Sequence, residues 1–235
     1  AAVEVTLGGW SARARGGLLV AVTGPPTRVR VDGVEVGSHG AVRVADGELI
    51  EVLAPARGVR NYVAVRGGVD VPPELDSRST DTLSGLGPPP LHPGDVLAVG
   101  RDDDEWPAAE FAPVGSLPDV TELIAAPGPR HHRLVDLVSL AIGRWTVAAA
   151  SNRVGVRLHR DDGSELPQHR PDLPELPSEG VPLGGVQIPP SGLPVLFLAD
   201  HPVTGGYPVV AVLTAESVAR AAQLAAGDVV RLRLH

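Results

Sequence analysis

The sequence contains no cysteine, no methionine and no lysine, and only 3% of its 235 residues are aromatic. Without cysteine, the chain cannot form a disulfide scaffold, a thiolate zinc site or a thiol nucleophile. Without lysine, it cannot supply a P-loop lysine, a Schiff base or a biotinyl-lysine. Arginine side chains and backbone amides are therefore the groups that remain to hold an anion.

Further absences bear on location and partners. No run of 18 apolar residues is present, so we expect no membrane span, and no secretory signal begins at Ala1. The net charge of −8 opposes binding to nucleic acid, which needs a basic patch. We therefore expect a cytoplasmic protein without membrane or nucleic-acid partners. The missing methionine has two explanations: it was removed, or the chain begins inside a domain, since residues 1–7 already have a strand pattern.

Glycine and proline are abundant, with 28 and 24 residues, and the 43% hydrophobic content suffices for a core. Short β-rich segments separated by turn residues predict a mainly β fold. The strongest signal is at residues 28–36, where Asp32-Gly33 interrupts an alternating pattern, as in a type I′ hairpin. Two short helices are also predicted, over residues 133–142 and after Thr214, which would cap the second helix.

Residues 101–118 read as a linker, acidic at first and then rich in alanine and proline. We therefore predict two β-rich subdomains, at residues 1–115 and 116–235. The run from Asp102 to Asp104 does not fit a calcium-binding EF-hand loop, because no glycine is sixth and no glutamate is twelfth. No metal site is predicted elsewhere.

Three segments carry residues suited to binding or catalysis. The first combines Gly67-Gly68 with the run from Ser77 to Thr80, in a proline-rich loop over residues 71–93. Paired glycines let the backbone turn sharply or approach a ligand, and hydroxyls around Arg78 suit a carboxylate or phosphate. The alternative is that these polar side chains only pin the loop through local hydrogen bonds.

The second segment runs from Ser151 to Leu158. If it is a strand, Arg153 and Arg157 share one face, with Gly155 between them. The gap at Gly155 would then admit a flat ligand. The alternative, equally weighted, is an ordinary solvated strand face.

The third segment surrounds Asp200, which ends an apolar run and needs a partner if it is buried. Thr204 and the amides of Gly205-Gly206 are suited to binding an oxyanion, because consecutive backbone N–H groups form anion-binding nests. His201 does not form a triad with Asp200, since neighbours on an extended chain face opposite ways and no Gly-x-Ser-x-Gly elbow exists. From the residues alone, the sequence predicts a β-rich protein with two Gly-rich loops whose Arg, Asp and Thr residues are suited to binding a small anion.

The third segment, with Ser178-Glu179-Gly180 before it and Gly227-Asp228 after it, resembles the family known as allophanate hydrolase subunit 2. This family is also called the biotin-dependent carboxyltransferase family, and it includes the C subunit of 5-oxoprolinase. The other two segments agree with it in the same order, from about Glu4 to the end. Asn152 stands where the family usually has aspartate. The family also has a further N-terminal segment, so we expect this chain to be an incomplete copy.

The resemblance implies a cyclophilin-like β-barrel architecture. It also implies a hetero-oligomeric, ATP-dependent 5-oxoprolinase that converts 5-oxoproline to glutamate. One partner would be an allophanate hydrolase subunit 1-like protein, which is the B subunit of 5-oxoprolinase, and another would be the A subunit of that enzyme. The resemblance implies that the complex uses ATP. No nucleotide motif is found in this sequence, so no ATP site is assigned to this chain. One alternative is the carboxyltransferase component of a biotin-dependent urea carboxylase or allophanate system, with biotin on a separate carrier. The other is a non-catalytic antagonist of a kinase-inhibitor partner.

The resemblance also carries roles for individual residues. Arg153 and Asp200 are the expected catalytic pair: Arg153, with Arg78, would bind substrate anions, and Asp200 would orient the substrate or act as a base. Further residues are expected to bind the small amide substrate or its oxyanion: Ser77, Arg78, Ser79, Thr80, Gln187, Thr204, Gly205, Gly206 and Tyr207.

Overall fold

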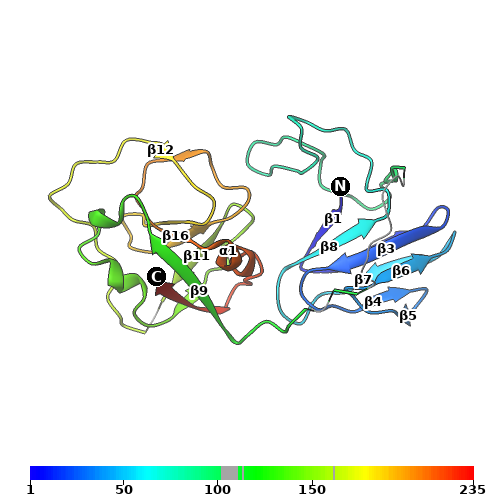
Figure 1. Cartoon of the computed structure of the whole chain (residues 1–235), viewed down its shortest axis with the longest axis horizontal. Helices are drawn as coiled ribbons and strands as arrows, with labels where there is room; N and C mark the ends of the chain where they lie inside the picture. Colours follow the sequence, from blue (N-terminus) through cyan, green and yellow to red (C-terminus); the bar gives the residue numbers. More distant parts are fainter. Residues whose placement is uncertain (102–110, 113, 161) are drawn as a thin grey trace. The chain divides into compact units, whose positions relative to one another are not determined.

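The structure is a computed structural model that describes residues 1–101, 111–112, 114–160 and 162–235. It divides into two compact units, Ala1–Leu117 and Pro118–His235, and each is described by itself. Both are built mainly from strands, which confirms the predicted fold class (Figure 1). Most of the predicted linker at 101–118, including the acidic run from Asp102 to Asp104, lies outside the described residues.

Unit 1 consists of two four-stranded sheets, with strand orders β1-β8-β3-β6 and β2-β7-β4-β5. The strand bounds are β1 Val3–Thr6, β2 Trp10–Arg13, β3 Leu18–Thr23, β4 Val29–Val31, β5 Val34–Glu35, β6 Ala41–Val44, β7 Leu49–Val52 and β8 Arg60–Val65. Valines from both sheets form one buried cluster, so the alternating side chains of each strand bury one face. The predicted hairpin is confirmed, because β4 and β5 form an antiparallel pair. Asp32 and Gly33, which join them, both have the positive φ that a type I′ turn requires.

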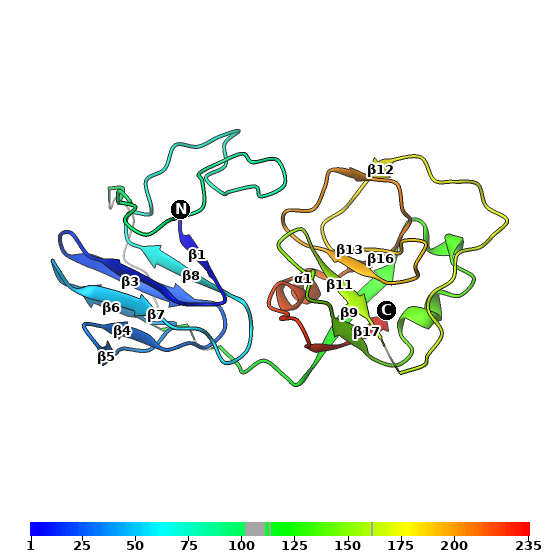
Figure 2. The ribbon, with the colours of Figure 1, turned by 180° about the vertical axis from the view of Figure 1, so that it is seen from behind.

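Unit 2 is a closed barrel with strand order β10-β11-β14-β13-β16-β9-β17, and β10 pairs with β17 to close it. Its strand bounds are β9 Val120–Pro127, β10 Trp145–Val147, β11 Gly155–His159, β13 Gly185–Gln187, β14 Val195–Phe197, β16 Val209–Leu213 and β17 Val229–Leu234. A separate two-stranded ribbon joins β12 (Glu179–Gly180) to β15 (Thr204–Gly205). Figure 2 shows β13, β16 and β17 of the barrel from behind. The predicted barrel architecture is confirmed.

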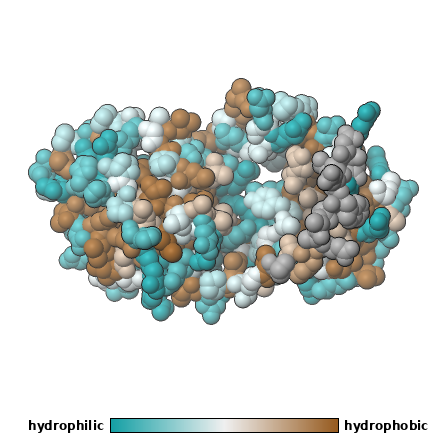
Figure 3. Space-filling model, in the orientation of Figure 1, coloured by the Kyte–Doolittle hydropathy of each residue, from teal (hydrophilic) through white to brown (hydrophobic). Residues whose placement is uncertain are grey.

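The barrel core contains Trp145, whose side chain is fully buried and whose indole N–H donates to the carbonyl oxygen of Leu140 at 2.9 Å. Inward-facing Leu, Val and Ile side chains from the barrel strands surround it. Hydrophobic side chains also remain at the surface: Val135, Val138 and Ile142 are all more than half exposed. Figure 3 accordingly shows hydrophobic and hydrophilic residues interspersed over the visible face.

One of the two predicted helices is an α-helix. α1 (Ala215–Ala221) follows Thr214, whose hydroxyl accepts from the Ser217 N–H at 3.3 Å, as predicted for its N-cap. The helix predicted over 133–142 is wrong: the chain there forms two 3-10 helices, η1 (His131–Arg133) and η2 (Leu137–Leu140). Asp136 interrupts the pattern, because it is extended and its carboxylate accepts from the Val138 N–H at 2.8 Å. No described helix is long and apolar enough to cross a membrane.

We predict that Gly128→Ala destabilises unit 2. A Cβ atom at this buried position, just after β9, would lie 2.7 Å from the carbonyl oxygen of Val209 and 2.8 Å from the amide nitrogen of Ala211. Because both neighbours are backbone atoms, we expect a loss of roughly 1–3 kcal/mol in the free energy of unfolding. Chemical denaturation measures it. Gly180→Ala is the matched control, since a Cβ there meets nothing within 4 Å, and an equal loss in both variants would contradict the prediction.

Candidate functional site

The pairing of β11 with β14 brings Arg153 and Asp200 together. Arg153 precedes β11 and Asp200 follows β14, and these strands are antiparallel, with Gly155 opposite Phe197. The start of one strand therefore meets the end of the other, and the Asp200 N–H donates to the Arg153 carbonyl oxygen at 3.2 Å. This backbone hydrogen bond holds the two residues next to one another independently of their side chains.

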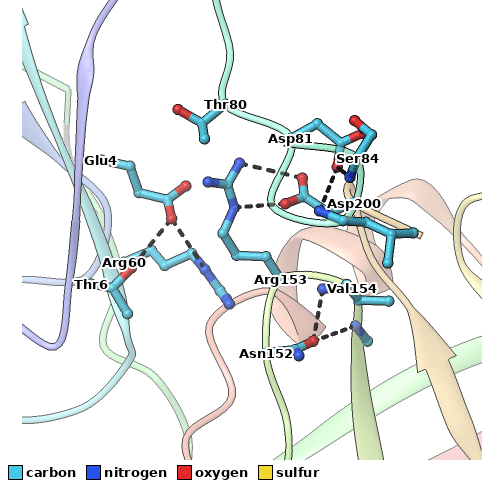
Figure 4. Close-up of polar contacts among 12 residues, drawn as sticks. Glu4, Thr6, Arg60, Thr80, Asp81, Ser84, Asn152, Arg153, Val154 and Asp200 are labelled. Carbon is cyan, nitrogen blue, oxygen red and sulfur yellow. Dashed lines mark hydrogen bonds and ion pairs between the residues drawn. The ribbon is translucent and has the colours of Figure 1, made fainter. Parts of the chain in front are cut away.

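The two side chains form a bidentate ion pair (Figure 4). Arg153 Nε lies 3.2 Å from Asp200 Oδ2, and Arg153 Nη2 donates to Asp200 Oδ1 at 3.3 Å. The Asp200 side chain is 8% exposed and that of Arg153 is 27% exposed, so the carboxylate is the more deeply buried partner. A buried carboxylate needs such a partner, and the planar guanidinium holds it in one orientation.

Asn152 shapes the turn that presents Arg153. Its Oδ1 accepts from the N–H groups of Val154 at 2.9 Å and Gly155 at 3.3 Å (Figure 4). An aspartate oxygen would accept the same two bonds, so the substitution of asparagine preserves this turn.

Gly155 does not leave a gap for a flat ligand. A Cβ atom there would lie 3.0 Å from the carbonyl oxygen of Leu196 and 3.2 Å from Val195 Cγ1, both on β14. The neighbouring strand therefore fills the space that the sequence pattern left open. Arg157 is exposed, whereas Arg153 lies outside the strand and turns to Asp200.

The β12–β15 ribbon carries Thr204 and Gly205, and an ion pair anchors it. Arg130 Nε and Nη2 donate to Glu179 Oε2 at 2.9 and 2.7 Å. These bonds raise the pKa of Arg130 above its ordinary value. Glu179 pairs with Gly205 across the ribbon. Sequence reasoning missed Arg130, because no local pattern signals a partner 49 residues away.

Gln187, Gly205 and Tyr207 form a second cluster in unit 2. Gln187 is 7% exposed, and its Nε2 donates to the Tyr207 carbonyl oxygen at 3.0 Å. A Cβ at Gly205 would lie 3.1 Å from that same nitrogen, so only glycine fits there without displacing the amide. Thr204 and the Tyr207 side chain are exposed.

A small apolar cluster connects this ribbon to the turn at Asp200. Val181, which continues the β12 strand, packs with Val195 and Phe197 of β14. The Phe197 ring lies 6.3 Å from the ring of His201, centroid to centroid, and His201 is next to Asp200 in the chain. The apolar cluster therefore connects the β12–β15 ribbon to β14, the strand that leads into the turn at Asp200.

The predicted residues Ser77, Arg78, Ser79 and Thr80 lie in unit 1, in the loop that follows Gly67-Gly68. Arg78 Nε donates to the Val71 carbonyl oxygen at 2.9 Å, and the Thr80 hydroxyl donates to the Pro88 carbonyl oxygen at 2.7 Å. These bonds pin the loop internally, which is the alternative that the sequence left open.

Gly67-Gly68 also packs against its own chain. Both residues have positive φ, and a Cβ at Gly67 would lie 2.2 Å from the carbonyl oxygen of Gly100. The Gly100 N–H donates to the Gly68 carbonyl oxygen at 2.9 Å. The close backbone approach expected of this pair is therefore to the segment at Gly100.

A sequence family, known proteins and a solved structure each match nearly the whole chain. Residues 1–234 match the family described as carboxyltransferase domain, subdomain A and B. The chain is 32% identical to the C subunit of 5-oxoprolinase from Escherichia coli (strain K12), covering 97% of this chain and 73% of that protein. It is 28% identical to urea amidolyase of Saccharomyces cerevisiae, covering 97% of this chain and 13% of that protein. The crystal structure of TTHA0988 superposes with a TM-score of 0.85 at 32% identity, covering 99% of this chain but only 45% of that one.

We predict that Arg153 and Asp200 are energetically coupled. Arg153→Gln and Asp200→Asn should each lower the free energy of unfolding by roughly 1.5–3 kcal/mol, because each removes a charge-assisted contact of the pair. The double variant should lose less than the sum of the two. Denaturation of the four proteins in this cycle measures the coupling. Arg170→Gln is the control, since the Arg170–Asp172 pair is largely exposed and should contribute little. Strictly additive losses would contradict the prediction.

We also predict that Gly205→Ala disturbs Gln187. The added methyl group would press on Gln187 Nε2 and weaken its bond to Tyr207, with an expected cost of about 1 kcal/mol. NMR of the Gln187 side-chain amide, together with denaturation, checks this. Gly206→Ala is the matched control because its Cβ meets nothing within 4 Å. Indistinguishable Gln187 signals in the two variants would refute the prediction.

Proposed function

The chain belongs to the carboxyltransferase domain family, subdomains A and B, and on this premise we propose that it is one subunit of an ATP-dependent 5-oxoprolinase. The observation that carries the proposal is the 32% identity to the C subunit of Escherichia coli 5-oxoprolinase over nearly the whole chain. The chain spans less than half of the TTHA0988 chain, so the activity would belong to a larger assembly. Its partners would be an allophanate hydrolase subunit 1-like protein, in the place of the B subunit, and a protein like the A subunit.

The proposed reaction opens the lactam of 5-oxoproline to glutamate, adding one water across the amide C–N bond. Hydrolysis of ATP by the complex supplies the driving force. The substrate offers two features for recognition: a carboxylate, and an amide carbonyl that gains negative charge when it is attacked. Recognition of both requires cationic groups and hydrogen-bond donors held in fixed positions.

Arg153 and Asp200 are suited to the two parts of the substrate, its carboxylate and its lactam amide. We assign Arg153 to the substrate carboxylate, because its position is fixed by Asp200 through two contacts of 3.2 and 3.3 Å. Asp200, as a hydrogen-bond acceptor, would orient the lactam N–H or the attacking water, or act as a base. The Gly205-Gly206 amides, with Thr204 and Gln187, would donate to the carbonyl oxygen as its charge develops.

A second candidate rests on the similarity to urea amidolyase, 28% over 97% of this chain. In that case the chain would be the carboxyltransferase component of a biotin-dependent system that acts on urea or a similar amide. Because these 235 residues contain no lysine, biotin would have to be carried outside them.

The test is reconstitution of the complex from this chain and its two proposed partners. We predict oxoproline-dependent ATP hydrolysis with release of glutamate. Arg153→Ala and Asp200→Ala should each lower kcat/KM by about 100-fold or more, the cost typical of removing one preorganised polar group. Arg170→Ala, which removes an exposed arginine of the same unit, should stay within about twofold of wild type.

Size-exclusion chromatography should first establish that every variant complex assembles. Unchanged turnover in assembled Arg153→Ala and Asp200→Ala complexes would overturn the residue roles. A wild-type complex without oxoproline-dependent ATP hydrolysis would overturn the 5-oxoprolinase proposal. If the same preparation carboxylates urea from a carboxybiotin carrier, the second candidate replaces it.

A further inference from the structure

A groove of about 980 Å³ opens on unit 2, at the end of the barrel away from Arg153. Arg153 precedes β11, whereas Arg160, which lines the groove, follows it. Five strand residues separate the two places, a distance of roughly 16 Å along the strand. The groove is therefore distinct from the site proposed above, and an inference about it stands independently of the proposed function.

Four arginines line this groove, together with one acidic residue: Arg144, Arg160, Arg231, Arg233 and Asp162. This concentration of positive charge stands out on a chain whose net charge is −8. Two of the arginines already have partners. Arg233 Nη2 donates to Glu122 Oε1 at 2.7 Å. Arg160 stacks over the Trp145 ring at 4.0 Å and donates to the Ile142 carbonyl oxygen at 2.7 Å.

The strand register places Arg144 and Arg231 next to one another. β10 and β17 are antiparallel, with Trp145 opposite Val230, so the next pair along the ladder joins Arg144 to Arg231. Like charges in directly opposed positions repel each other. The fold therefore places two arginines at opposed backbone positions, at an energetic cost that an anion between their side chains would remove.

The acidic neighbours within the described residues are already engaged. Glu122 lies opposite Arg231 in the β9–β17 register but bonds to Arg233. Asp162 accepts from the Ser164 N–H at 2.9 Å, and this bond holds its pKa below the usual range, so the carboxylate stays charged. In the described part of the chain, the side chains of Arg144 and Arg231 have no hydrogen bond or ion pair.

The rest of the lining is largely apolar. Val229, Leu232 and Leu234 of β17 contribute, as does Ala141 from the end of η2. A ligand that fits this lining has an anionic group for the two arginines and an apolar body for the aliphatic surface. The groove volume is within the range of small-molecule sites.

We propose that this groove binds a small molecule in which a phosphate monoester is attached to an apolar body. The phosphate carries nearly two negative charges and three acceptor oxygens, enough to engage two guanidinium groups at once. It lies between Arg144 and Arg231, and the apolar body contacts Val229, which is on the same face of β17 as Arg231.

Phenyl phosphate is the probe, titrated into the full chain with ¹⁵N NMR detection of backbone amides and arginine Nε groups. We expect saturable shifts at Arg231, Arg144 and Val229. Inorganic phosphate should bind the same place more weakly because it lacks the apolar body, and phenol should not bind. Arg144→Gln and Arg231→Gln should each weaken phenyl phosphate binding by about tenfold, the value of one charge-assisted hydrogen-bonding partner.

Arg43→Gln is the matched control, since it removes the same charge from an exposed position on β6 of unit 1, and it should bind as wild type does. Arg231→Lys keeps the charge but loses the planar fork, so it should bind with intermediate affinity. Thermal unfolding should show that the variants remain folded. Binding that is equally weakened by Arg43→Gln, or shifts that map away from the groove, would overturn the proposal. So would unchanged affinity in both groove variants.

Discussion

The antiparallel pairing of β11 with β14 is the constraint on which the candidate site depends. It brings together two residues that are 47 positions apart in the sequence, and a backbone hydrogen bond joins them in addition to the side-chain contacts. The bidentate contact between Arg153 and Asp200 then satisfies a carboxylate that is almost wholly buried. Because a closed barrel leaves its strands little freedom to shift register, the geometry of the pair is set by the fold.

The remaining residues of the site are held by contacts of the same long-range kind. Arg130 anchors the ribbon through Glu179, and the ribbon presents Thr204 and Gly205. Gln187 reaches the ribbon from the barrel wall through its bond to Tyr207. Arg153, Gln187 and Gly205 are thus each held by a neighbouring group, as preorganised polar sites require.

Much of the fold could be predicted from local signals in the sequence. Asp32-Gly33 specifies its hairpin because both positions need positive φ, and Thr214 caps α1 through its own hydroxyl. The helix predicted at 133–142 failed because periodicity does not register the extended conformation of Asp136. Gly155 was misread for a related reason: a glycine that admits a ligand and one that admits a neighbouring strand have the same sequence pattern.

The candidate site could be predicted only in part from the sequence. Motif resemblance selected Arg153 and Asp200, but their contact follows from strand pairing, which no local pattern encodes. The central claim is that Arg153 holds the carboxylate of the substrate. Calorimetric titration of 5-oxoproline into the assembled wild-type and Arg153→Ala complexes tests it most directly. The account predicts at least about tenfold weaker binding in the variant, the value of one charged hydrogen-bonding partner. Equal affinity in the two complexes would contradict it.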